Sequence, residues 1–96
     1  MHVVAVVLVL VHGLVVRGPT KPVCSMTEPC DEPAARIALL FERGHTIVRV
    51  RTDENGRYRV KLRPGTWAIH VARIQPRALV VRHPMRADLF IDTGIR

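Results

Sequence analysis

Cationic residues occupy every second position of one short segment, residues 57–63, and this spacing is the clearest sign of chemistry in the chain. They are Arg57, Arg59, Lys61 and Arg63. Because alternate side chains of a β-strand point to the same face, a strand here would present a cationic row. Arg49 and Arg51 alternate in the same way in the preceding segment. We expect all six side chains to share one face of a hairpin, where they could bind an anionic partner.

Composition offers a second explanation for these charges. The formal net charge is +7 and the sequence pI is about 11.0, which suits an acidic partner such as nucleic acid, acidic polysaccharide or anionic lipid. Lysine, however, stands only at Lys21 and Lys61, and arginine supplies every other basic residue. A GC-rich genome favours arginine codons without selection for binding, and charge on edge strands also deters aggregation. The sequence leaves open whether the basic face is functional or compositional.

Aromatic residues narrow the class of partner. Tyr58 and Trp67 fall on the apolar side of their segments, so we expect both to point into the core. A single-stranded nucleic acid needs exposed aromatic rings on which its bases stack. We therefore expect no sequence-specific binding of nucleic acid, and an acidic envelope polymer or an anionic protein surface is the expected partner.

The two cysteines, Cys24 and Cys30, lie in a proline-rich connection between residues 20 and 33. The gap between them does not match the two-residue gap of zinc or thioredoxin-like sites, and no second pair completes a metal site. A local disulfide is the preferred interpretation. Because disulfides persist in oxidising compartments, we expect a secreted or cell-envelope protein.

Other reactive residue types lack the spacing that catalysis or metal binding requires. Ser25 lies inside the cysteine loop without the strand–turn–helix of a nucleophile elbow, and the nearby acids Glu28, Asp31 and Glu32 are explained as solvating that loop. No histidine pair has a ligand spacing. The histidines are His2, His12, His45, His70 and His83. We expect no catalytic residue, no metal and no cofactor, and hence no enzyme.

The N-terminal residues form an apolar run from Val3 to Val11 that is too short for the ~20 residues of a membrane helix. It has the length of a signal h-region, but no basic segment precedes it and no cleavage site follows. It can be the end of a longer signal sequence or a β-strand, because a continuous apolar run fits both. We expect residues 1–11 to form a separate segment, residues 12–96 to form one domain, and no transmembrane span.

Short alternating segments separated by turn residues predict an all-β domain. The expected strands cover residues 13–18, 35–44, 45–52, 57–63, 67–72, 78–83 and 87–92. Asn55-Gly56 suits a turn with positive φ, Pro64-Gly65 suits the next turn, and Asp53 can accept backbone hydrogen bonds within the first. The expected core side chains are Tyr58, Val60, Leu62, Trp67 and Ile69.

Residues 52–69 resemble the signature of carboxypeptidase regulatory-like domains, also described as transthyretin-like or prealbumin-like sandwiches. Its pattern is T-D-x-x-G-x-[YF]-x-[VL]-x-L-x-P-G-x-[YW]-x-[VI]. The matching residues are Thr52, Asp53, Gly56, Tyr58, Val60, Leu62, Pro64, Gly65, Trp67 and Ile69. With the cysteine loop and the terminal IDTGIR, the chain is similar from Gly13 to Arg96 to small exported bacterial proteins of this type.

The resemblance implies a single antiparallel β-sandwich of about seven strands. It also implies a non-enzymatic binding or structural module of the bacterial cell envelope, whose ligand is unassigned. An electrostatic binder of acidic envelope polymers is the alternative that the basic face suggests.

Overall fold

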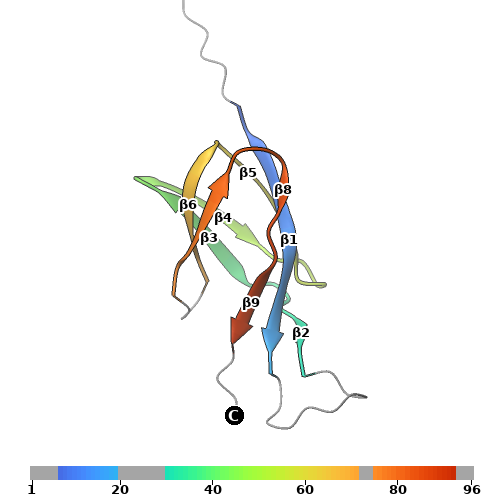
Figure 1. Ribbon diagram of the computed structural model, residues 1–96. Coiled ribbons are helices and arrows are strands. Elements are labelled where there is room, and N and C mark those ends of the chain that lie inside the picture. The colour runs from blue at the N-terminus through green and yellow to red at the C-terminus, as the bar shows by residue number, and fades with distance from the viewer. Residues whose placement is uncertain (1–6, 20–29, 72–74, 93–96) are drawn as a thin grey trace, which may run out of the picture.

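The computed structural model describes residues 7–19, 30–71 and 75–92, and in these residues every regular element is a β-strand (Figure 1). The strands are β1 (Val9–Gly18), β2 (Glu32–Pro33), β3 (Ala38–Arg43), β4 (Thr46–Arg51), β5 (Arg57–Leu62), β6 (Gly65–His70), β7 (Arg77–Val81), β8 (Met85–Arg86) and β9 (Leu89–Asp92). The all-β prediction is confirmed.

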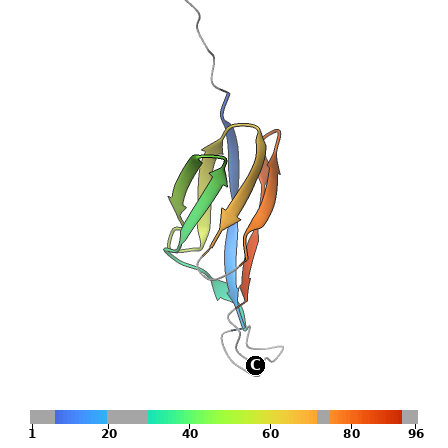
Figure 2. The same ribbon diagram turned by 90° about the vertical axis from the view of Figure 1, so that its left-hand side faces the viewer.

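Two sheets pack face to face as a β-sandwich. One is four-stranded and antiparallel, in the order β4-β3-β6-β7, and Figure 2 looks onto it with β1 running behind. The other has five strands, and the long strand β1 lies at its centre. β2 and β5 pair with β1 in antiparallel orientation, and β8 and β9 pair with it in parallel orientation. The predicted sandwich is therefore confirmed, but the second sheet is mixed rather than antiparallel throughout.

The parallel pairing follows from the path of the chain. After β7 the chain leaves the four-stranded sheet and returns beside β1 as β8 and β9, running in the direction of β1. The structure also has more strands than the predicted seven. The two short strands β2 and β8, each two residues long, account for the difference.

The predicted hairpin between β4 and β5 is wrong. β4 pairs with β3 in one sheet, whereas β5 pairs with β1 in the other. Residues 52–56, which we call the crossing turn, carry the chain from one sheet to the other. Alternation of apolar residues fixes which side of each strand faces the core, and a hairpin and a crossing between sheets satisfy that pattern equally well.

The core lies between the sheets and contains the five side chains expected there. They are Tyr58, Val60, Leu62, Trp67 and Ile69, each at most 8% exposed. Phe41 packs against Tyr58 with ring centroids 6.0 Å apart. The indole Nε1 of Trp67 donates a hydrogen bond to the Arg63 carbonyl at 2.9 Å, so the polar atom of this buried ring has a partner.

The N-terminal apolar run and the cysteine loop are described only in part. Strand β1 begins at Val9, so residues 9–11 of the expected N-terminal segment belong to the sandwich, with Val9 and Val11 buried. Cys30 is 8% exposed, while Cys24 lies outside the described residues, and the disulfide stays a prediction. No helix long and apolar enough to cross a membrane occurs within residues 7–19, 30–71 and 75–92.

Candidate binding site on the cationic edge

The crossing turn is closed by the side chain of Asp53. Its Oδ1 accepts hydrogen bonds from the backbone N–H groups of Asn55 at 2.8 Å and Arg57 at 2.9 Å. The bond from Arg57, then the bond from Asn55, hold the pKa of the Asp53 carboxyl below its usual value, because both favour the ionised form. This carboxylate is therefore committed to the turn, although it lies next to the cationic strand β5.

Thr52 and Gly56 join the crossing turn to the rest of the fold. The Thr52 side chain is buried, and its hydroxyl donates to the Ala34 carbonyl at 2.6 Å and accepts from the Ile37 N–H at 2.9 Å. The Gly56 carbonyl accepts a hydrogen bond from the Val15 N–H at 2.7 Å. The residues at the Thr, Asp and Gly positions of the motif thus build the passage between the sheets.

The crossing turn also separates the six cationic side chains that we expected on one face. Arg57, Arg59 and Lys61 are exposed on the outer face of the five-stranded sheet, since the residues between them are buried. Arg49 and Arg51 are exposed on β4, in the other sheet. The expected single cationic face is therefore wrong, because the strands that carry it belong to different sheets.

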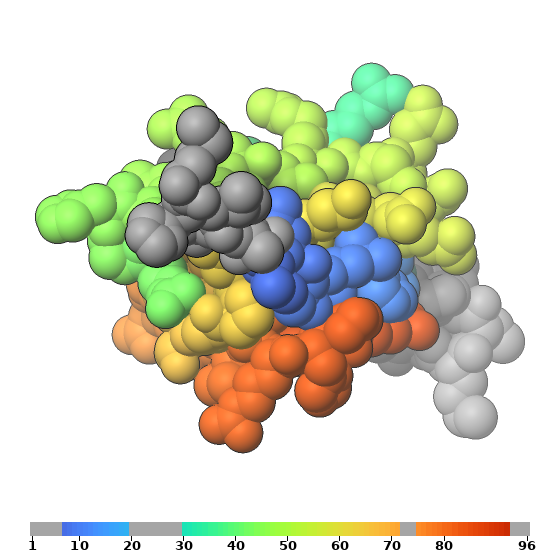
Figure 3. All heavy atoms as spheres, turned by 90° about the horizontal axis from the view of Figure 1, so that it is seen from above, coloured from blue at the N-terminus to red at the C-terminus, as the bar shows by residue number. Residues whose placement is uncertain are grey.

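A shallow groove nevertheless brings cations of both strands together at the edge formed by β4 and β5, which we call the cationic edge. Its volume is about 550 Å³, and its lining residues are Leu10, His12, Arg51, Asp53, Arg57, Tyr58 and Arg59. Figure 3 looks down on the sandwich, with the green to yellow-green side chains of this part of the chain on one side of β1 (blue) and the orange ones on the other. Arg51, Arg57 and Arg59 thus meet at one groove.

The arginines of this groove form no ion pair with any described residue. Glu54 pairs with Arg36 at 2.6 Å, and Asp53 closes the turn. Arg51 Nη1 donates to the Arg36 carbonyl at 3.0 Å, which positions its guanidinium without neutralising it. The groove therefore carries a net positive charge.

The remaining predicted cations do not line this groove. Lys61 lies further along β5, opposite Leu10 of β1, and Arg63 follows the end of that strand. Arg49 lines a second open groove of about 570 Å³ on the four-stranded sheet, together with His70. Arg51 lines both grooves. In the second groove His70 Nε2 lies 3.5 Å from Glu42 Oε2, so an acid stands beside this second site.

The turn residues Pro64 and Gly65 lie where the chain crosses back to the four-stranded sheet, and Gly65 is the first residue of β6. Arg43 of β3 donates from Nη1 to the Pro64 carbonyl at 2.8 Å. These residues shape the connection and take no part in the groove.

Sequence reasoning missed two basic residues on the outer face of the five-stranded sheet, His12 and Arg86. His12 on β1 pairs with Arg59 of β5 and with Arg86 of β8. The burial pattern of β1 places His12 on the outer face, but the first strand expected from the sequence begins only at Gly13. No local pattern could place Arg86 beside it, because the parallel pairing of β1 with β8 joins distant parts of the chain.

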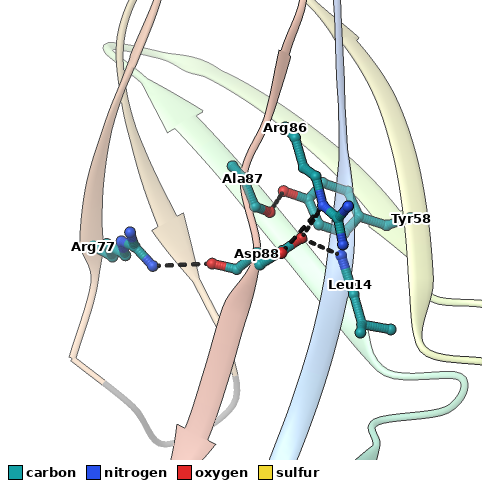
Figure 4. A network of polar contacts seen from close by, with 6 residues as sticks. All are labelled: Leu14, Tyr58, Arg77, Arg86, Ala87 and Asp88. Carbon is teal, nitrogen blue, oxygen red and sulfur yellow. Dashed lines mark hydrogen bonds and ion pairs between the residues drawn. The ribbon is translucent and has the colours of Figure 1, made fainter.

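A polar network fastens β8 and β9 within the five-stranded sheet, on the side of β1 away from β5 (Figure 4). The buried Tyr58 hydroxyl donates to the Ala87 carbonyl at 2.5 Å, and burial raises the pKa of Tyr58 to about 12, so the donor stays protonated. Asp88 Oδ1 accepts from the Leu14 N–H at 2.9 Å. We call these contacts, together with those that Arg77 and Arg86 make to Asp88, the Asp88 network.

Two arginines complete the Asp88 network. Arg86 Nε donates to both carboxylate oxygens of Asp88, at 3.0 and 3.1 Å, and Arg77 Nη1 donates to the Asp88 carbonyl at 3.1 Å. The hydrogen bond from Arg86, followed by that from Leu14, lowers the pKa of Asp88. Arg77 belongs to the four-stranded sheet, so this bond joins the two sheets at their second edge.

The residues considered for catalysis are scattered or lie outside the described part of the chain. Ser25, Glu28 and His2 are outside it. Among the described residues, no three His, Cys, Asp or Glu side chains come together in a group that could hold a metal ion. Glu32 forms an ion pair with Arg17.

No family model matches the sequence, and no curated protein is significantly similar to it. Among solved structures, the chain is similar to the crystal structure of a DUF3823 family protein from Bacteroides ovatus ATCC 8483, with a TM-score of 0.58 and 13% sequence identity. The match covers 86% of this chain but 43% of that one, so the chain spans less than half the length of the protein it matches. At this identity the likeness shows the fold, and the class that fold and comparison define is the β-sandwich domain.

Proposed function

We propose that this chain is a non-enzymatic, carboxypeptidase regulatory-like module of the bacterial cell envelope that binds an acidic polymer at its cationic edge. The first support is the crossing turn. Thr52, Asp53 and Gly56 occupy the positions of the carboxypeptidase regulatory-like pattern, and each makes a contact that the passage between the sheets requires. The resemblance thus rests on residues with a defined structural role.

The observation that carries the binding role is the groove shared by Arg51, Arg57 and Arg59. All three arginines are exposed and Glu54 is paired with Arg36. Asp53, which closes the turn and also lines the groove, offsets only one of the three positive charges. Guanidinium groups bind carboxylates through paired, charge-assisted hydrogen bonds. A carboxylate-bearing polymer would supply the acids that this edge lacks.

Binding of polygalacturonate at pH 7.5, measured across a salt series, tests this proposal. We expect binding at low ionic strength that weakens steeply with salt, because the interaction is electrostatic. The double variant Arg57→Gln/Arg59→Gln should bind about tenfold more weakly, since each lost exposed contact costs up to about 1 kcal/mol.

The matched control is Arg49→Gln/Arg82→Gln, which removes the same charge away from the groove. It should retain most of the affinity. An equal loss in both double variants would show that net charge rather than the cationic edge binds the polymer, and absence of binding by the unmodified protein at low salt would overturn the proposal.

Export is the second part of the proposal and rests on Cys24 and Cys30. In an oxidising compartment we expect the two thiols to be bonded to each other. Thiol alkylation of the mature protein followed by intact-mass measurement should show no modification before reduction and two modified cysteines after it. Two reactive thiols in the untreated protein would contradict export.

A further inference from the structure

A row of basic residues crosses the outer face of the five-stranded sheet at right angles to its strands. His12 of β1 lies between Arg59 of β5 and Arg86 of β8 in the register of the sheet. All three side chains are exposed. Because neighbouring strands are about 4.8 Å apart, the row spans roughly 10 Å, which is enough for two charged units of an extended polymer.

Two grooves meet at this row. The groove of the cationic edge contains His12, Arg57 and Arg59. A smaller groove of about 290 Å³ is lined by His12, Gly13, Leu14, Arg57 and Arg86. His12 and Arg57 line both grooves, so the basic surface of the cationic edge continues across β1 to Arg86. The His12 imidazole lies at the middle of this surface.

The side chains around His12 are basic, apolar or already bonded. From β5 it faces Arg57, Arg59 and Lys61, from β8 it faces Arg86, and the edge groove adds Arg51. The two acids nearby are Asp88, whose carboxylate offsets the charge of Arg86 and also interacts electrostatically with His12, and Asp53, which closes the crossing turn. Arg51, Arg57, Arg59 and Lys61 outnumber the one acid that remains. A proton on His12 therefore adds a positive charge to a cluster that an extended anion would neutralise.

The apolar neighbours of His12 indicate the class of polymer. Leu10 and Leu14 lie on either side of it along β1, both partly exposed on the same face. Each sugar ring of a polyuronate bears one carboxylate and also has an apolar face of C–H groups. These faces can pack on leucine side chains. Polyphosphate has no such apolar surface.

We propose that the row Arg59–His12–Arg86 extends the binding surface and that protonation of His12 tightens the binding of a polyuronate. This inference rests on the proposed function, because it concerns the same ligand class and adds its regulation. Histidine changes its charge between pH 5 and 8, which gives the surface a response in the range where the arginines do not titrate.

The test measures the affinity for polygalacturonate at pH 8.0 and pH 5.5 at constant ionic strength. The polymer keeps its charge over this range, since carboxyl groups titrate near pH 4. We expect about threefold tighter binding at pH 5.5 for the unmodified protein, the size of one exposed charge–charge contact. His12→Gln should reduce this ratio to about one, whereas the control His45→Gln, in the turn between β3 and β4, should keep it.

Each outcome separates this inference from the proposed function. Binding that does not change with pH, or a pH ratio that survives in His12→Gln, overturns the inference and leaves the proposed function standing. No binding at either pH overturns both. Tighter binding of a polyphosphate of matched charge would contradict the choice of a polyuronate.

A measurement on the unmodified protein covers the case in which His12→Gln folds poorly. If protonation of His12 tightens binding, the bound polymer must in turn favour the protonated imidazole, because the coupling is reciprocal. The NMR titration midpoint of the His12 ring should therefore move to higher pH when polygalacturonate is added. An unchanged midpoint would overturn the inference.

Discussion

The two edges of the sandwich use arginine differently. At the cationic edge, Arg57 and Arg59 form no ion pair with a described residue and line an open groove. At the opposite edge, Arg77 donates to the Asp88 carbonyl and joins the two sheets, while the Asp88 carboxylate offsets the charge of Arg86 on the adjoining outer face. The same residue type therefore supplies exposed charge at one edge and structural contacts at the other.

The difference follows from how the chain passes between the sheets. At the cationic edge the crossing turn makes the passage with backbone hydrogen bonds and the side chains of Thr52 and Asp53. At the other edge residues 82–84 carry the chain from β7 to β8, and a side chain adds a second link, the bond from Arg77 to the Asp88 carbonyl. Where the turn already joins the sheets, the arginines remain available to a ligand.

The largest expected effect comes from breaking the crossing turn with Gly56→Ala. Gly56 has a φ of 77°, and a Cβ there would lie 2.6 Å from the Val15 carbonyl oxygen. We expect a loss of about 3 kcal/mol in the free energy of unfolding, because positive φ and a backbone clash act together. Urea unfolding measures this.

Gly44→Ala is the matched control for this substitution. Gly44 also has positive φ, 58°, but a Cβ there would meet nothing within 4 Å. Its loss should be about 1 kcal/mol, the cost of the backbone conformation alone. Equal losses in the two variants would show that the crossing turn is not tightly packed against β1.

A smaller effect is expected at the opposite edge from Tyr58→Phe. The variant keeps the buried ring but leaves the Ala87 carbonyl without the hydroxyl that donates to it. Loss of a partner by a buried acceptor costs about 1–3 kcal/mol, and we expect unfolding free energy to fall within that range. A loss below about 0.3 kcal/mol would mean that the hydroxyl does not help to hold β8 to the sheet.

The sequence predicted the strands and the core well because alternation is a local property. The burial of Tyr58, Val60 and Leu62 between exposed cations follows from the pattern of residues 57–62. The partner of β5 was not predictable in this way. An Asn-Gly turn between alternating segments is typical of a hairpin, and the contact of Thr52 with Ala34 and Ile37 that joins the turn to another segment has no local signal.

The candidate site was predicted only in part, because alternation along one strand is a local property and the pairing of distant strands is not. The outward direction of Arg57 and Arg59 could be predicted. His12 precedes the expected first strand, residues 13–18, so its direction follows only from the observed β1. That Arg86 lies beside His12 depends on the parallel pairing of β1 with β8, which is set by the path of the whole chain. The sequence also led us to expect Arg49 on the same face as the cations of β5, because a hairpin between β4 and β5 would put both strands in one sheet.

The smallest expected effect is that of Asp88→Asn, and it depends on pH. Asp88 is ionised and hydrogen-bonded in the folded protein, with a pKa lowered first by Arg86 and then by Leu14. A carboxyl whose folded pKa is depressed stabilises the fold above its unfolded pKa, and this stabilisation is lost as the pH falls through the folded pKa. Because half of the side chain is exposed, we expect a loss of at most about 1 kcal/mol at pH 7.

Unfolding of Asp88→Asn and of the unmodified protein should be compared at pH 7 and pH 2.5. The difference in unfolding free energy should be largest at pH 7 and smaller at pH 2.5, because the stabilisation by the ionised carboxyl is lost as the pH falls toward and through its folded pKa. A difference that stays constant between the two pH values would show that the charge of Asp88 does not contribute.

The central claim is that the cationic edge, and not the edge where Arg77 joins the two sheets, binds the acidic polymer. A two-dimensional NMR titration of the protein with polygalacturonate at low salt tests it most directly. We predict shifts of the backbone amides of Arg51, Arg57 and Arg59, and of His12 on the adjoining strand, with little change in β7 and β9. Shifts centred on β7 and β9, or spread evenly over both edges, would contradict the claim.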